Sequence, residues 1–312
     1  MENNPEYLAA KERFDHYYEE TIVPSLQEVE TKRKRYLLWF ILLCMFVSVW
    51  VGLIITGKIS LFHGGDEGLI ICFAVLAVCA PLFMYYKKSK ESILPSVIGF
   101  FGDFHYDFRP KISDSLLEKS KIMPTYSSIK TDDSFSGKYQ DVSTVITEYA
   151  RFERVVQKKE NVKRLVEKKC GHGIIFSAEM KKNFTGQTIV VKDKGFMNKF
   201  THYKGLSRVG LESVEFEKAY EVYSDDQVEA RYILTAVMLE YIMELKKVFP
   251  KTTYSFFDNQ VFINVELKGN LFECSSFFRS VLNKKRIEKN FKQLYLLFSI
   301  VDTLRLNQNK LL

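Results

Sequence analysis

Two long runs of apolar residues constrain this chain of 312 residues more than any other feature. Residues 36–57 and residues 68–86 contain no charged side chain. A helix of about 20 apolar residues can cross the hydrocarbon core of a bilayer, which is about 30 Å thick. Aromatic residues, which favour the membrane–water interface, lie toward the ends of the runs: Trp39, Trp50, Tyr85 and Tyr86. We therefore predict two transmembrane helices, in preference to two buried helices of a soluble core.

The basic residues beside the two predicted spans indicate their orientation. Four basic residues at 32–35 precede the first span. Three lysines follow the second span: Lys87, Lys88 and Lys90. The loop at 58–67 holds a single lysine. Because basic residues stay on the cytoplasmic side, both termini and the main domain are expected in the cytoplasm. The first run begins too late, and is too long, for a cleaved signal peptide.

The cysteines, histidines and glycines exclude several classes of site. The chain has five cysteines and five histidines, and it contains no C-x-x-C or H-E-x-x-H pair. The odd number of cysteines argues against a disulfide framework and favours a reducing compartment. Phosphate-binding glycine motifs are absent from the sequence. We therefore predict no cofactor, no metal and no catalytic residue. The Gly64–Glu67 segment resembles the start of a diguanylate cyclase signature, but a short loop between two spans favours a simple turn.

The chain divides into four predicted parts. Residues 1–35 are expected to form a cytosolic helical segment, with one helix that starts at Pro5 and another that starts after Pro24. The other parts are a transmembrane hairpin at 36–86, a connector at 87–137, and a cytosolic domain at 138–312.

The cytosolic domain alternates between strand-like and helix-like patterns. Segments rich in β-branched and aromatic residues predict strands at 138–157, 173–180, 188–192 and 214–222, and a hairpin at 254–257 and 261–267. A turn is expected at 170–173. Ser224 and Gln227 have the spacing of a capping box, which predicts a helix that ends before Pro250. A basic amphipathic helix is expected at about 283–306. This order predicts an α+β fold with a mostly antiparallel sheet and packed helices.

Three segments carry a resemblance to a known family: Asn183–Val191, Phe216–Thr235 and the hairpin at 253–267. Together with the order of helix, two spans and domain, they resemble the bacterial family named domain of unknown function 3137. The resemblance implies a membrane protein but no activity and no catalytic residues. It also implies a membrane-protein partner of the LemA type.

One cluster of acidic residues is a candidate cation or ligand site. Asp225, Asp226 and Glu229 lie within five residues and could hold a hard cation. The alternative is that Ser224 caps a helix whose first turn favours acidic side chains. The capping spacing favours this structural interpretation.

Two basic segments are candidate contacts with anionic lipid or an acidic partner. Residues 151–169 carry 8 basic and 3 acidic side chains, and residues 279–312 carry 8 and 2. The candidate contact residues are Arg151, Arg154, Lys158, Lys159, Lys163, Arg164, Lys284, Lys285 and Arg286. The alternative is a solvated surface. Nucleic acid is not favoured, because these segments contain no recognised reading motif.

These patterns predict a membrane-anchored cytosolic interaction module of the bacterial inner membrane, which binds protein partners or anionic lipid and could form homo-oligomers. The alternative is an enzyme or a domain that senses a small ligand or nucleotide, with a site assembled from distant residues. A deep cavity with converging polar groups would favour the alternative.

Overall fold

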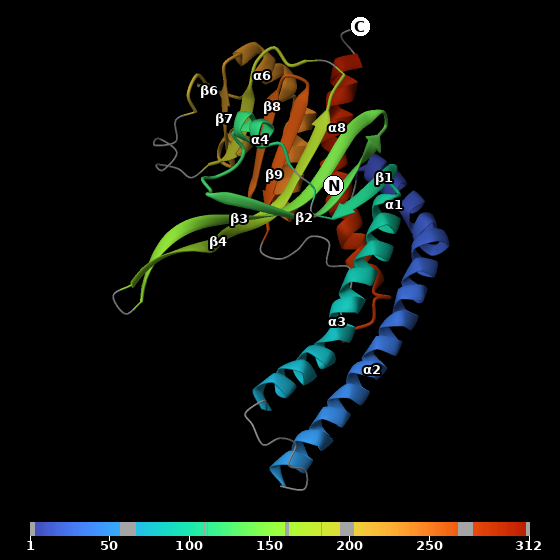
Figure 1. Cartoon of the computed structure of the whole chain (residues 1–312). Helices are drawn as coiled ribbons and strands as arrows, with labels where there is room; N and C mark the ends of the chain where they lie inside the picture. The colour runs from blue at the N-terminus through green and yellow to red at the C-terminus, as the bar shows by residue number, and fades with distance from the viewer. Residues whose placement is uncertain are drawn as a thin grey trace. The chain divides into compact units, whose positions relative to one another are not determined.

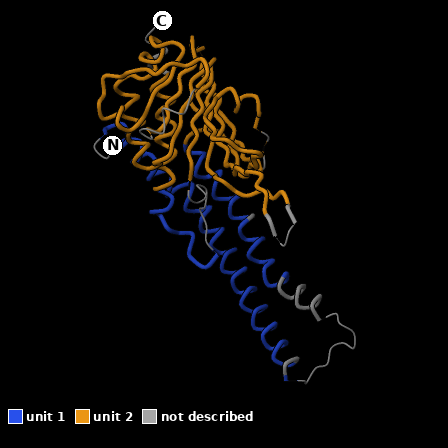
Figure 2. Tube along the Cα trace, turned by 90° about the vertical axis from the view of Figure 1, so that its left-hand side faces the viewer, with its two compact units in different colours: residues 1–100, 272–288 blue, residues 101–271, 289–312 orange. Residues whose placement is uncertain are grey.

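The computed structural model describes residues 4–56, 67–108, 110, 112–159, 162–181, 183–193, 203–267 and 277–309. The chain forms two compact units, which Figure 2 colours separately. The N-terminal unit contains residues 1–100 and 272–288, and the sheet unit contains residues 101–271 and 289–312. The last helix, α8 (Lys284–Asn309), contributes residues to both units.

The N-terminal unit is built from long helices. Helix α1 (Pro5–Tyr17), a π-helical turn η1 (Tyr18–Ile22) and α2 (Val23–Ile55) follow one another directly, and α3 (Glu67–Ile98) comes next. Pro5 occupies the first turn of α1, as predicted. Pro24 does not interrupt the chain of helices, so the prediction of a new helix after it is wrong. The π-helical turn ends at Ile22, two residues before Pro24, and its shifted hydrogen bonds accommodate a residue that lacks a backbone N–H.

One N-terminal helix is long and apolar enough to cross a membrane. It runs from Pro5 to Leu53 through η1, and none of its most apolar 18-residue stretch is buried. The exposed apolar side chains of α2 include Leu38, Trp39, Ile41, Leu42, Met45, Phe46 and Val49. Among the described residues, this helix alone meets the length and composition required for a span.

The sheet unit contains a nine-stranded antiparallel sheet in the described part of the chain (Figure 1). The strand order is β1-β2-β3-β4-β9-β8-β5-β7-β6. The strands are β1 (Asp103–Phe108), β2 (Ser128–Tyr139), β3 (Val142–Lys159), β4 (Val162–Glu179), β5 (Thr188–Lys192), β6 (Ser207–Val209), β7 (Tyr220–Ser224), β8 (Thr252–Phe257) and β9 (Gln260–Glu266). The shorter helices are α4 (Asp114–Ser120), α5 (Val214–Glu217), α6 (Gln227–Ile233) and α7 (Ala236–Val248). The α+β class and the antiparallel sheet are confirmed.

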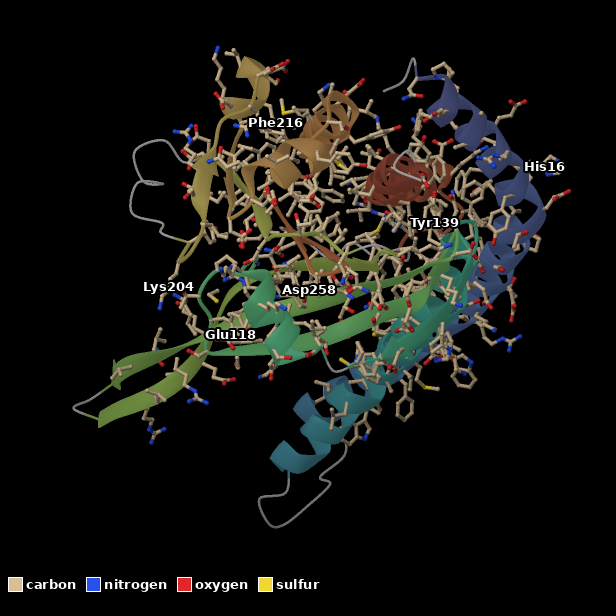
Figure 3. The ribbon with its side chains drawn as sticks, turned by 90° about the horizontal axis from the view of Figure 1, so that it is seen from above. His16, Glu118, Tyr139, Lys204, Phe216 and Asp258 are labelled. Carbon is tan, nitrogen blue, oxygen red and sulfur yellow. The ribbon has the colours of Figure 1, made fainter. Side chains whose placement is uncertain are left out.

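Helices α8 and α4 cover opposite faces of this sheet. On one face, the Phe298 ring of α8 lies 4.4 Å from the Tyr139 ring and 5.6 Å from the Phe176 ring, between centroids. Figure 3 shows Tyr139 beside α8. On the other face, Leu117 of α4 packs in a cluster with Ile175. Ile175 and Phe176 are neighbours in β4, so their side chains point to opposite faces.

Several predicted boundaries differ from the structure. Strand β1 and all but the last two residues of β2 lie inside the segment that was expected to be a connector, at 87–137. The turn expected at 170–173 is wrong, because β4 continues through these residues with a register shift opposite Arg151 and Phe152. A bulge absorbs the extra residue there without ending the strand.

The strand predicted at 214–222 is partly wrong. Its first residues form the short helix α5, because the Ser213 hydroxyl accepts a hydrogen bond from Phe216 N and caps the turn. Only the later residues belong to a strand, β7. The helix expected after Ser224 is also two helices, and Thr235 caps the second of them, α7.

Candidate functional site

A β-bulge in the sheet unit brings three carboxylates together. The register between β2 and β3 shifts between Thr131 and Ser134, so Asp132 and Asp133 of β2 lie opposite the single residue Glu148 of β3. One carboxylate oxygen from each of these three acids lies within 4.8 Å of the others. Asp133 and Glu148 are buried, with 0% and 3% of their surface exposed. Bulges commonly re-aim side chains next to functional sites.

The carboxylate cluster adjoins a cavity in the sheet unit. This cavity has a volume of about 920 Å³, and Asp132 and Glu148 both line it. Basic groups line it as well: Lys130, Lys169 and His172. The strands β2, β3 and β4 therefore supply acidic and basic groups to one space.

Two tyrosines support this region of the sheet. Tyr106 Oη donates a hydrogen bond of 2.6 Å to a carboxylate oxygen of Asp133. Tyr149, which lines the cavity, donates one of 2.6 Å to the side-chain oxygen of Asn264. Burial raises the pKa of Tyr149 above its usual value, so the hydroxyl stays protonated and remains a donor.

Hard divalent cations such as Mg²⁺ and Ca²⁺ prefer carboxylate oxygens as ligands. The three acids could therefore hold such a cation, and the cavity could admit a small molecule beside it. Sequence analysis missed this cluster, because Glu148 is distant in sequence and only the bulge brings it to the other two. The available signal was the consecutive pair Asp132 and Asp133 inside a strand.

Two of the acidic residues that were predicted as a candidate site, Asp225 and Asp226, accept hydrogen bonds from the backbone. Asp226, rather than Ser224, caps α6, and its carboxylate accepts hydrogen bonds from Val228 N and Glu229 N. Asp225 accepts a hydrogen bond of 2.7 Å from Gln187 N. Glu229 lies in the first turn of α6. The structure thus brings Asp225 and Asp226 against the segment before β5, and the capping role applies to Asp226.

Most of the first basic segment forms a two-stranded projection from the sheet. Strand β2 pairs with β3 as far as Phe152, and β9 pairs with β4 from Gly173 onward. We call residues 153–159 and 162–169, which extend past both neighbours, the arm. Figure 1 shows the arm projecting from the sheet.

The arm exposes apolar and basic side chains together. Val156 lies opposite Leu165, and these side chains are 60% and 66% exposed. Arg154 and Arg164 are exposed near them. The side chains of the other predicted contacts in this segment, Lys158, Lys159 and Lys163, lie outside the described residues. A two-stranded ribbon that leaves apolar pairs exposed is typical of a contact surface.

Arg151 is not part of that surface. Its side chain is buried, and its guanidinium group donates a hydrogen bond of 2.7 Å to Glu266 in β9. In the second basic segment, Lys284 pairs with Asp15 at 3.0 Å and with Glu19 at 3.6 Å inside the N-terminal unit. Lys285 is exposed, and Arg286 is half-buried at the start of α8. Intramolecular pairs therefore occupy part of the predicted basic surface.

The fold and these sites define an α+β protein with a long apolar N-terminal helix, a projecting β-arm and a cavity that carries three carboxylates. Residues 172–306 match the family described as "Protein of unknown function (DUF3137)". This match confirms the family resemblance indicated by the sequence.

Two further comparisons add little. No curated protein matches the chain. Among solved structures, the chain is similar to the crystal structure of the mycobacterial trehalose monomycolate transport factor A, TtfA, with 11% identity and a TM-score of 0.33. That likeness covers 63% of this chain and 88% of the other. At this TM-score, the likeness supports no conclusion about function.

Proposed function

We propose that this protein is a membrane-anchored interaction module of the bacterial inner membrane. In this proposal, α2 and α3 cross the bilayer as a hairpin, at about 36–57 and 68–86. Both termini and the sheet unit lie in the cytoplasm. The protein acts through contacts that the sheet unit makes.

The observation that carries this proposal is the exposed apolar surface of α2. Phe46 and Val49 are 70% and 64% exposed, and Trp39 is 57% exposed near the basic end of the run. Lipid would remove these side chains from water, and each fully buried large apolar side chain contributes roughly 1.5–3 kcal/mol. The basic residues at 32–35 and at 87–90 support the cytoplasmic orientation.

Thiol labelling in intact cells tests the orientation. Cys170 is exposed on β4 and reports on the sheet unit directly. A membrane-impermeant thiol reagent should leave Cys170 unlabelled until the inner membrane is opened. A Ser60→Cys variant, in the loop between the two helices, should react in intact cells. Labelling of Cys170 before the membrane is opened would contradict the proposal.

Anionic lipid headgroups are the partner that best fits the arm. Its exposed valine and leucine side chains favour an apolar layer, and Arg154 and Arg164 favour negative charge. Each basic residue near an anionic membrane surface contributes about 1 kcal/mol. An acidic protein, such as a partner of the LemA type, and a second copy of this chain are the competing occupants.

Full-length protein in lipid nanodiscs tests the arm. A fluorescent label on a Val156→Cys variant, prepared without the native cysteines, should shift its emission to the blue in discs that contain phosphatidylglycerol, and less in discs of phosphatidylcholine alone. Salt and the double substitution Arg154→Glu/Arg164→Glu should reduce the shift. The matched double substitution Lys218→Glu/Lys247→Glu, at exposed positions outside the arm, should leave it unchanged. Equal emission in both lipids would favour a protein partner.

The carboxylate cluster favours a second candidate function, the binding of a cation or a small ligand. Its specific observation is the bulge that places Asp132, Asp133 and Glu148 beside a cavity of about 920 Å³. Mg²⁺, Ca²⁺ or Mn²⁺ should raise the midpoint temperature of thermal unfolding. A cation at a hundredfold excess over its dissociation constant adds about 2.7 kcal/mol to stability.

Two substitutions in the same strand make this test specific. Glu148→Gln removes a ligand from the cluster and should abolish the rise in midpoint temperature. Glu153→Gln changes an exposed acid in the arm and should retain it. If no cation raises the midpoint of the unsubstituted protein, the cluster is a structural feature of the bulge.

A further inference from the structure

A segment near the C-terminus is attached to the start of the predicted first span. Arg33 in α2 donates a hydrogen bond of 2.9 Å to the carbonyl oxygen of Phe277. Glu30 accepts one of 3.1 Å from Val281 N. Arg33 and Glu30 also bond to each other at 2.7 Å, and both are buried. The pair therefore fixes the segment at two points, and Figure 2 colours this segment with the N-terminal unit.

Aromatic contacts extend this attachment into the predicted spans. The Phe277 ring lies 5.6 Å from the Phe40 ring and 5.5 Å from the Tyr85 ring, between centroids. The Phe278 ring lies 6.0 Å from the Phe40 ring. Phe40 belongs to the first predicted span and Tyr85 to the second. The segment thus touches both spans where each borders its basic flank.

The position of Phe40 sets the depth of these contacts. Phe40 lies four residues beyond Tyr36, where the first run begins. At a rise of about 1.5 Å per residue, this is roughly 6 Å along the helix axis. Interfacial segments bury their apolar side chains about 5–10 Å into the boundary between headgroups and acyl chains. Phe277 and Phe278 are therefore held at interfacial depth.

The segment also has the side chains that an interfacial element needs. Phe277 is buried within the N-terminal unit, whereas Phe278 and Leu282 are 64% and 46% exposed. Arg279 is exposed between them and suits anionic headgroups. The exposed Phe278 continues the apolar surface of α2 through its contact with Phe40. One surface then runs from the span onto this segment.

We propose that Phe277–Leu282 is a third membrane contact of this protein, in which the side chains of Phe278 and Leu282 enter the cytoplasmic leaflet beside the two spans. This inference rests on the proposed function, because the depth is measured from the first span. The segment lies more than 240 residues after Arg33, so the contact ties the C-terminal part of the chain to the bilayer surface.

Quenching by spin-labelled lipids tests the contact. Full-length protein without its native cysteines is placed in nanodiscs of phosphatidylcholine and phosphatidylglycerol, and a Phe278→Cys variant is labelled with an environment-sensitive fluorophore. Two matched variants carry the same label at exposed apolar positions: Phe46→Cys in α2 and Val228→Cys in α6. Nitroxide lipids with shallow or deep spin labels are then added.

The expected result is loss of most of the emission at position 278 with the shallow nitroxide, and less loss with the deep one. Position 46 should respond most to the deep nitroxide, and position 228 to neither. If 278 behaves like 228 while 46 is quenched, the third contact is wrong although the span stands. If 46 also behaves like 228, the proposed membrane anchoring fails.

A second variant keeps an aromatic ring at the tested position. Phe278→Trp is prepared with Trp39→Phe and Trp50→Phe, so that tryptophan emission reports on position 278 alone. Its emission should shift to the blue in nanodiscs and be quenched by the shallow nitroxide. A blue shift without quenching would place the ring against protein and would overturn the inference.

Discussion

The buried pair of Arg33 and Glu30 shows how single residues can organise the N-terminal unit. Both side chains are almost fully buried, yet each also bonds to the backbone of the segment at 277–281. A buried charge is tolerated when it is paired and its remaining hydrogen-bonding capacity is satisfied. Here, the satisfying groups come from a distant part of the chain, so the pair joins two segments as well as stabilising itself.

Arg33→Ala should release this segment. Loss of one member of a buried ion pair leaves the other charge unpaired, which costs about 3 kcal/mol. Trypsin should then cut more rapidly after the exposed Arg279. Lys32→Ala is the control, because Lys32 is exposed and, within the described part of the chain, forms an ion pair only with the exposed Glu28 one helical turn away. Equal cleavage of both variants would show that the buried pair does not hold the segment.

Asp226 provides a second prediction at the scale of one residue. Hydrogen bonds from Glu229 N, from the Thr185 hydroxyl and from Val228 N hold the pKa of Asp226 below its usual value. Asp226→Ala should lower the midpoint temperature of thermal unfolding by ~2–4 °C, because the cap is lost. Asp226→Asn should keep most of the cap.

The lowered pKa also predicts a dependence on pH. The charged form is favoured by folding, so its contribution is present above the ordinary value of 3.8 and is lost as the pH falls through the lower folded value. Unfolding midpoints measured from pH 5 downward should fall less steeply for Asp226→Asn than for the unsubstituted protein. Parallel curves for the two proteins would contradict this assignment.

At the scale of elements, backbone approach in the sheet decides where strands can pair. Gly173 lies in β4 opposite Glu266 of β9. A Cβ atom at Gly173 would lie 1.9 Å from the carbonyl oxygen of Val265. Real side chains never come this close to a backbone oxygen, so only glycine permits the two strands to meet here. The pairing of β4 with β9 ends at this residue, and the arm at 162–169 lies beyond it along β4.

Gly173→Ala should therefore destabilise the sheet unit by about 3 kcal/mol, since the strands must move apart. Gly210→Ala is the matched control, because its Cβ would meet only the Glu217 carboxylate, at 3.8 Å. That substitution should change the free energy of unfolding by less than about 0.5 kcal/mol. Chemical denaturation followed by circular dichroism measures both values, and equal losses would contradict the close approach.

At the scale of the whole molecule, we expect the exposed apolar surface of α2 to determine how the protein partitions between water and lipid. The predicted span is flanked by basic residues, and its exposed side chains are almost all apolar. Arginine at the centre of a span costs about 2.5–3.5 kcal/mol in insertion. Two such substitutions in one helix should therefore weaken anchoring severely.

Phe46→Arg/Val49→Arg should lower the fraction of the protein that stays with membranes after extraction at alkaline pH. Leu8→Arg is the control, because Leu8 is an exposed apolar residue of the same continuous helix but lies outside the predicted span. The control should remain in the membrane fraction. If the double variant remains there too, α2 does not anchor the protein by itself.

The sequence alone determined the local elements and the broad class of this protein. Periodicity and turn residues predicted the helix at Pro5, the β8–β9 hairpin and α8, because these depend on neighbours in the chain. The same local rules failed at Pro24 and at 170–173, where a π-helical turn and a bulge absorb what would otherwise end an element. The apolar runs and their basic flanks also came from sequence.

Only the tertiary structure decided which distant residues meet. The carboxylate cluster needs a bulge in β2 to oppose Glu148 in β3, and no spacing in the sequence reports a shift in strand register. The pairing of Arg33 with the backbone of Phe277 likewise joins residues that only folding brings together. Sequence patterns report periodicity along one chain segment, whereas the register between strands and the contacts between distant segments are set by packing as the whole unit folds.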